Sequence, residues 1–186
     1  LLLAPLLLLL VSCSNNNVNQ SKASDILTSS FSEKIDDFDN STTWKLRLWS
    51  ENKLPSDVVK EGQALISVTC TKYAQPKNFS SGYYVFSLIP SSYLKTSYVA
   101  NYADMKWDEN QSESKEFSSD FSGSFANFSY AGDLIKKLGK HSTLKIRYST
   151  VKNGEQIAEF NLSGDDNISK LLEKCELKKK GRQKTP

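Results

Sequence analysis

The sequence has few of the residues that metal and catalytic sites most often use. Its 186 residues contain one histidine and three cysteines, and no two cysteines have the spacing Cys-x-x-Cys, so a metal centre is disfavoured. It also has no Gly-x-Ser-x-Gly, no His-Glu-x-x-His and no phosphate-binding glycine loop. We therefore predict a protein that is not an enzyme and that holds no cofactor and no metal.

The sequence also lacks a strong net charge. Lysine and arginine number 24 against 21 aspartates and glutamates, a formal net charge of +3. Such a balance does not provide the positive field that attracts nucleic acid, so we expect no nucleic-acid partner. The lysines do gather near the C-terminus, and we predict a basic, disordered tail over residues 177–186.

The N-terminal apolar block is too short to span a membrane as a helix. Residues 1–10 read LLLAPLLLLL and lead into Val11, Ser12 and Cys13, after which the chain turns abruptly polar. An apolar run that ends at a small residue is typical of a secretory signal peptide, which we predict over residues 1–12. A complete signal peptide has a positive segment before its apolar block, so we expect further residues before Leu1.

A cysteine at the cleavage point resembles the lipobox of bacterial lipoproteins, in which the cysteine carries the lipid and begins the mature chain. We therefore expect a membrane partner through lipid on Cys13 and a flexible tether over residues 13–24, which are rich in Asn, Ser and Gln. Ser14 after the cysteine resembles the outer-membrane class, so the expected location is the periplasm, at the outer rather than the inner membrane. The alternative is an ordinary signal peptide in which Cys13 is only a small residue.

With Cys13 assigned to the lipid, Cys70 and Cys175 remain as an even pair. Because exported proteins fold in an oxidising compartment, the pair predicts one disulfide. The alternative is two buried free thiols.

Residues 25–176 have the pattern of a β-rich domain. Residues 43–49, 63–70 and 144–148 place apolar side chains at every second position, which is the period of half-buried strands, and residues 83–88 are a further predicted strand. Asn153 and Gly154 form a two-residue hairpin signal, residues 98–102 are a weaker strand candidate, and 117–130 read as strand, turn and strand. Helical spacing predicts short helices over 25–38, 132–139 and 168–175. The expected fold is mainly β, an antiparallel β-sandwich with two or three short helices.

Three side chains are candidates for a functional role. Trp49 falls on the polar face of its strand, so it is the aromatic residue most open to a binding surface, although packing is the competing interpretation. His141 has no visible partner and is expected to be an exposed loop residue. Asp165 precedes the last helix and is expected to cap it rather than to hold a metal.

The order of these features resembles a known family. The residues that carry the resemblance are a strand ending in Val68-Thr69-Cys70, the pair Trp107-Asp108, and the close Ala158-Glu159-Phe160-Asn161-Leu162-Ser163-Gly164 with a short helix and Cys175. They are similar to the periplasmic accessory proteins of type VI secretion and their phage-encoded relatives, over about residues 43–175. The resemblance implies a β-sandwich with a disulfide and no enzyme activity.

These observations together predict a membrane-anchored lipoprotein that acts as an envelope accessory or protein-binding module, with an envelope protein as its partner and type VI secretion as its implied system. Two alternatives stay open from the sequence. One is a prophage-type superinfection-exclusion lipoprotein, and the other is an envelope glycan hydrolase, which would need a pair of carboxylates in an open cleft.

Overall fold

The computed structural model describes residues 28–57, 62–73 and 83–177. The structure is mainly β, as predicted, with 46% strand and 12% helix. The predicted signal peptide, the tether and all of the basic tail except Leu177 lie outside the described residues. No helix in the described part of the chain is long and apolar enough to cross a membrane.

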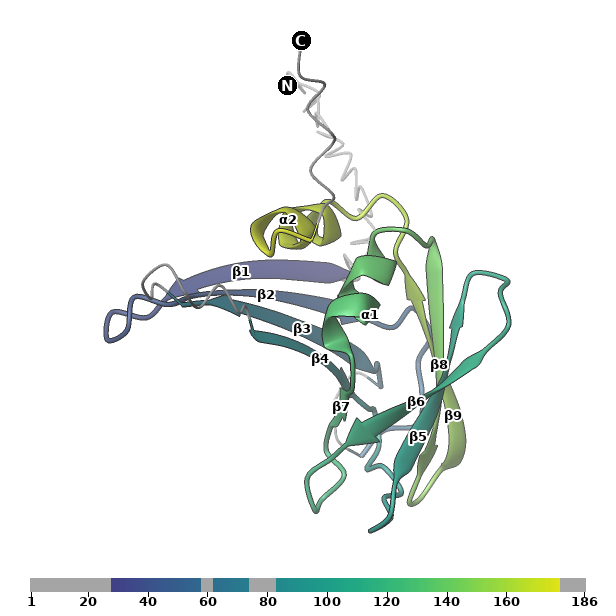
Figure 1. Cartoon of the computed structure of the whole chain (residues 1–186). Coiled ribbons are helices and arrows are strands. Elements are labelled where there is room, and N and C mark those ends of the chain that lie inside the picture. The colour runs from purple at the N-terminus through teal and green to yellow at the C-terminus, as the bar shows by residue number, and fades with distance from the viewer. Residues whose placement is uncertain (1–27, 58–61, 74–82, 178–186) are drawn as a thin grey trace, which may run out of the picture.

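Nine antiparallel strands form one hydrogen-bonded sheet (Figure 1). Its spatial order is β1-β2-β3-β4-β7-β6-β5-β8-β9. The strands are β1 (Ser29–Ile35), β2 (Thr42–Trp49), β3 (Leu65–Lys72), β4 (Tyr83–Ile89), β5 (Asn101–Trp107), β6 (Glu113–Ser118), β7 (Ala126–Phe128), β8 (Thr143–Thr150) and β9 (Gly154–Asn161). Because all nine belong to one sheet, the finer prediction of a sandwich is not confirmed.

The strand register places the large apolar side chains on one face of the sheet. Leu46 of β2 stands opposite Val68 of β3, which stands opposite Phe86 of β4, and all three side chains are fully buried. On the other side of β7, Met105, Ile146 and Ala158 repeat the arrangement across β5, β8 and β9. Residues of both groups belong to one core, and Figure 1 shows the two groups running in clearly different directions. The sheet therefore bends so that its own two halves share a core.

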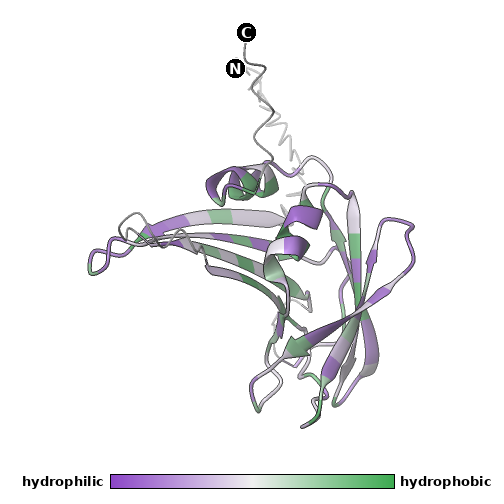
Figure 2. Cartoon of the chain, in the orientation of Figure 1, coloured by the Kyte–Doolittle hydropathy of each residue, from purple (hydrophilic) through white to green (hydrophobic). Residues whose placement is uncertain are grey.

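Two amphipathic helices cover part of this apolar face. Helix α1 (Ala131–Leu138) contacts β4, whereas α2 (Asp166–Lys174) contacts β1 and β2. Figure 2 shows apolar and polar residues alternating around both helices. Asp165 caps α2 as predicted, since its carboxylate accepts the backbone N–H groups of Asn167 and Ile168 at 2.8 and 3.3 Å.

The outer edge of β9 is covered by the loop between β2 and β3. The Asn52 side chain takes the place of a neighbouring strand, because its amide donates to the Ile157 carbonyl at 2.7 Å and its oxygen accepts from the Glu159 N–H at 2.9 Å. The Glu51 N–H adds a bond to the Glu159 carbonyl at 2.7 Å. Contacts of this kind protect an edge strand from pairing with other chains.

Two local predictions need correction. The segment 25–38 was expected to be a helix, but its described part forms β1, because the edge of β2 offers a complete set of backbone partners. The β8–β9 hairpin is present, but its loop has three residues, 151–153, and Gly154 instead pairs with Thr150 at φ +64°.

The shared core gives a direct stability prediction. Phe86→Ala removes a fully buried ring that packs edge-on against Phe128, with ring centroids 6.0 Å apart. We expect it to lower the free energy of unfolding by about 3–5 kcal/mol, measured by chemical denaturation. Phe38→Ala is the matched control, because that side chain is 97% exposed and its loss should change stability by less than about 0.5 kcal/mol. Equal effects of the two variants would contradict the assigned core.

Candidate functional site

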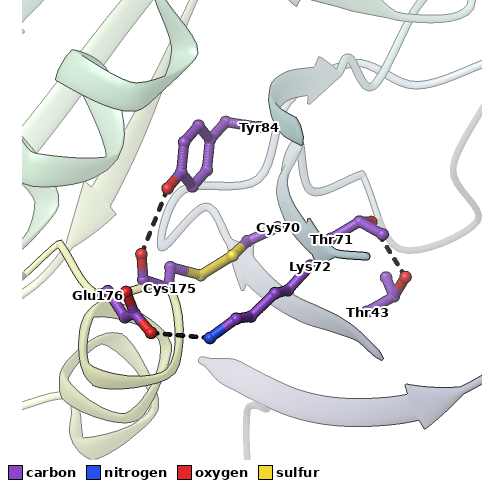
Figure 3. Close-up of a disulfide and its surroundings, with 7 residues drawn as sticks. All are labelled: Thr43, Cys70, Thr71, Lys72, Tyr84, Cys175 and Glu176. Carbon is purple, nitrogen blue, oxygen red and sulfur yellow. Dashed lines mark hydrogen bonds and ion pairs between the residues drawn. A yellow bond between two sulfur atoms is a disulfide. The ribbon is translucent and has the colours of Figure 1, made fainter. Parts of the chain in front are cut away.

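Cys70 and Cys175 lie at disulfide-bonding distance, as the sequence predicts. Cys70 is on β3, Cys175 directly follows α2, and their Cα atoms are 6.1 Å apart, which is a typical separation for a disulfide. Both side chains are buried, and Figure 3 shows the bond between the helix and the strand. It ties together segments 105 residues apart in the sequence.

Two further contacts hold the end of α2 beside this bond (Figure 3). The Lys72 ammonium lies 2.8 Å from the Glu176 carboxylate, and the Tyr84 hydroxyl donates to the Cys175 carbonyl at 3.3 Å. The first pair is exposed on both sides, so it contributes little to stability. The disulfide is the covalent link between the C-terminal helix and the sheet, and it adds to the packing of the buried α2 side chains Ile168, Leu171 and Leu172. Cys13, the predicted lipidation site, lies outside the described residues.

Trp49 lies at the end of β2 within a row of apolar side chains on the outer face of the sheet. It stands opposite Leu65, and Leu65 stands opposite Ile89. All three side chains are half-buried. Trp49 therefore packs within its row and presents only part of its ring, and its role as a binding surface stays a prediction.

A second candidate surface lies at the end of the sheet opposite α2 (Figure 1). It is formed by the β4–β5 loop, residues 90–100, and the β6–β7 loop, residues 119–125, which we call the tip loops. Leu94 joins them, since it pairs with Thr150 of β8 and its N–H donates to the Gly123 carbonyl at 2.9 Å. Its side chain is buried, so the junction of the two loops belongs to the core.

The β4–β5 loop is also fixed to the sheet by buried hydrogen bonds. The Pro55 carbonyl accepts hydrogen bonds from the Ser91 and Ser92 hydroxyls, both at 2.9 Å, and from the Gln156 amide at 3.2 Å. All three donor side chains are buried. Because a buried polar group without a partner is costly, this cluster specifies one position for the loop.

Asp120 organises the β6–β7 loop from within. Its carboxylate accepts the hydroxyls of Ser122 and Ser124, the latter at 2.6 Å, and the Ser124 N–H at 2.8 Å. Hydrogen bonds from the two serine hydroxyls lower the pKa of Asp120 from 3.8 to about 2. No lysine or arginine among the described residues forms an ion pair with it. The carboxylate is therefore ionised at physiological pH and has no cationic partner in that part of the chain.

The β4–β5 loop has a similar internal network. Its Ser97 hydroxyl donates to the Ala100 carbonyl at 2.8 Å, while the Asn101 side chain accepts the Ser97 N–H at 2.6 Å. The side chains of Tyr98 and Phe121, one from each tip loop, are nonetheless fully exposed. They line one surface pocket of about 280 Å³ together with Ser97, Asn101, Ser119 and Asp120.

The sequence contained only a weak signal for this pocket. Tyr98 fell at the start of a weak strand candidate, but β5 begins at Asn101. Phe121 fell within the segment 117–130, whose predicted strand–turn–strand form is confirmed by β6 and β7. The serines around Asp120 were a usable clue, because Asp and Ser side chains often hydrogen-bond to nearby backbone in turns.

His141 differs from its expectation as an exposed loop residue without a partner. Its side chain is 21% exposed, and its Nδ1 atom lies 2.9 Å from the Asp108 carboxylate. The bond with His141, and then the Thr143 and Ser142 N–H groups, lower the pKa of Asp108. The ring also packs on Trp107, with centroids 5.4 Å apart. The pair therefore joins the β5–β6 turn to the start of β8.

Trp107 links this contact to a charged group on the next strand. Its indole N–H donates to the Glu113 carboxylate at 3.0 Å, and Glu113 also pairs with Lys137 of α1 and with Lys115. Burial opposes ionisation of Glu113, but the two lysines outweigh it and lower the pKa of that carboxyl. Neighbouring side chains and backbone groups hold the carboxylates of Asp108 and Glu113, so both carboxylates have a structural role. The described residues contain no cluster of three or more potential metal ligands from His, Cys, Asp and Glu.

The disulfide predicts a change in mass and in stability. Reduction under denaturing conditions should add the mass of two hydrogen atoms to the intact chain, measured by mass spectrometry. Replacing both Cys70 and Cys175 by Ala should lower the free energy of unfolding by about 2–5 kcal/mol, because the bond closes a long loop in the unfolded chain. An unchanged mass after reduction would mean two free thiols.

The junction of the tip loops predicts an effect of one glycine. Gly123 has φ +69°, and a Cβ atom there would lie 2.5 Å from the Leu94 carbonyl oxygen. Gly164 also has a positive φ, +67°, but nothing lies within 4 Å of its added Cβ. Gly164→Ala should therefore cost only backbone strain of about 1–2 kcal/mol, whereas Gly123→Ala should cost at least about 1 kcal/mol more through the clash. Denaturation curves that shift equally would contradict the close contact.

A comparison with protein-family models, curated proteins and solved structures finds no match for this chain.

Proposed function

We propose that this protein is a lipid-anchored accessory protein of the bacterial envelope that binds a protein partner and catalyses no reaction. In this proposal Cys13 carries the lipid, residues 13–24 form the tether, and the β-rich domain stands in the periplasm at the outer membrane. In this proposal the protein acts in type VI secretion, which is the system that the resemblance implies.

The observation that carries the proposal is the position of Cys70 and Cys175. Their Cα atoms lie 6.1 Å apart although 105 residues separate them in the sequence. Disulfides persist in oxidising compartments and are rare in the cytosol. A pair at bonding distance therefore supports export, and export is what the apolar block before Cys13 predicts.

The polar groups of the domain support binding rather than chemistry. The Asp108 carboxylate is occupied by His141 and by two backbone N–H groups, and both residues have a clear structural role between β5 and β8. The tip loops, in contrast, present fully exposed aromatic rings on a hydrogen-bonded framework. Aromatic side chains exposed on such loops are typical of protein-recognition sites.

The lipid anchor is tested by Cys13→Ser in cells that make the natural precursor. Unmodified protein should be found in the membrane fraction and carry acyl mass on Cys13, whereas the variant should lose both, because serine offers no thiol for the lipid. Ser12→Ala is the matched control and should stay anchored, since alanine keeps a small residue before the cysteine. A mature chain that begins elsewhere and lacks acyl mass would exclude the proposal.

A further inference from the structure

We propose that the pocket between Tyr98 and Phe121 binds a cationic side chain, a lysine or an arginine, of the partner protein. We call this pocket the tip pocket. The inference deepens the proposed function, on which it rests for the class of partner, and it names the chemistry that the domain recognises.

Two aromatic rings from separate loops provide the first attraction. Tyr98 belongs to the β4–β5 loop and Phe121 to the β6–β7 loop, both are fully exposed, and both line the same pocket. The face of an aromatic ring carries partial negative charge and attracts an ammonium or guanidinium group. A pocket bounded by two such rings therefore favours a cation over a neutral group.

The Asp120 carboxylate provides the second attraction in the same pocket. Its hydrogen-bond partners are serine hydroxyls and a backbone N–H, which carry no net charge. No ion pair to Asp120 occurs among the residues that the structure describes. The pocket thus keeps a full negative charge that a cationic ligand would balance.

The fixed backbone of the tip loops strengthens the binding of a cation, which each ring and the carboxylate alone attract only weakly. Ser97 and Asp120 each fix their own loop through several hydrogen bonds, and Leu94 locks the loops together. Because the loop backbones are fixed, only the exposed side chains of Tyr98 and Phe121 must be ordered when the ligand enters, so less of the contact energy is lost.

The position of the pocket favours a protein over a lipid headgroup. Asn153, just before β9, donates to Ser92 of the β4–β5 loop at 2.7 Å, whereas Asn161 at the other end of β9 lies beside Thr28. The eight residues of β9 span roughly 24 Å. Thr28 is the first described residue after the proposed tether, so the tip pocket lies at the end of the domain away from Thr28.

The test is an NMR titration of the full chain carrying Cys13→Ser, which removes the lipid site and changes no described residue. The probes are N-acetyl-arginine amide and, as the neutral control, N-acetyl-norleucine amide. The arginine probe should shift the signals of residues 96–101 and 119–121 in proportion to its occupancy, whereas the neutral probe should bind at least about threefold more weakly. High salt should weaken binding of the arginine probe only.

Three variants assign the binding to the pocket. Tyr98→Ser and Phe121→Ser should each weaken arginine binding about three- to tenfold, and both should fold normally because the side chains are exposed. Phe38→Ser is the matched control, since it removes an equally exposed ring from the β1–β2 turn, and it should leave binding unchanged. Equal binding of both probes, or wild-type binding by the Tyr98 and Phe121 variants, would overturn the proposal.

A second arm uses vesicles of phosphatidylcholine, whose headgroup is also cationic at its quaternary nitrogen. Sedimentation of the chain with these vesicles, lost in Phe121→Ser, together with no binding of the arginine probe, would replace the protein partner by a lipid surface. The lipid on Cys13 does not enter either measurement, and sedimentation through the apolar block of residues 1–12 would persist in Phe121→Ser. Failure of the tip pocket and failure of the anchor proposal are therefore separate results.

Discussion

The fold depends on one apolar sheet face that has no second sheet to cover it. Alternation along the strands puts residues such as Phe86 and Ile146 on the same side, where both are fully buried. A flat sheet would leave that face in water at a cost of about 25 cal/mol for each Å² of apolar surface. The sheet instead bends at the short strand β7, so that its two halves share a core, and α1 and α2 cover part of the remaining apolar face.

Because the sheet bends, helix α2 at one end and the loops at the other must be held in position. A disulfide and a set of buried hydrogen bonds do this. At one end α2 must stay on β1 and β2, where its buried apolar side chains pack and the Cys70–Cys175 bond holds it. At the other end the loops between strands converge, and the Pro55 carbonyl gathers three buried donors that fix them. The fixed backbone of the tip loops is a consequence of this closure, because Leu94 is part of the core and contacts Gly123 of the other tip loop.

The parts of this fold that the sequence predicts are those whose signal is local. Alternation over residues 43–49 and helical spacing over 168–175 both identify elements of the structure, and the cysteine count identifies a pair at bonding distance. The spacing of Phe31 and Ile35 fits a helix equally well, and only the open edge of β2 decides for a strand. His141 and Asp108 are 33 residues apart, and the row around Trp49 depends on strand register. Long-range pairing of this kind has no signature in a single sequence.

A single cation held by two rings and one carboxylate binds weakly, so its usefulness depends on confinement. Under the proposed function the domain and its partner share the envelope, and the lipid on Cys13 restricts the domain to a thin layer beside one membrane. Holding the domain and its partner at one membrane raises their effective concentration, which makes a weak contact useful. The tip pocket then binds basic side chains reversibly, while the anchor keeps the domain near its partner for longer than the pocket alone could. This division accounts for a domain whose covalent cross-link secures its C-terminal helix and whose tip loops, at the opposite end, carry the fully exposed rings of Tyr98 and Phe121.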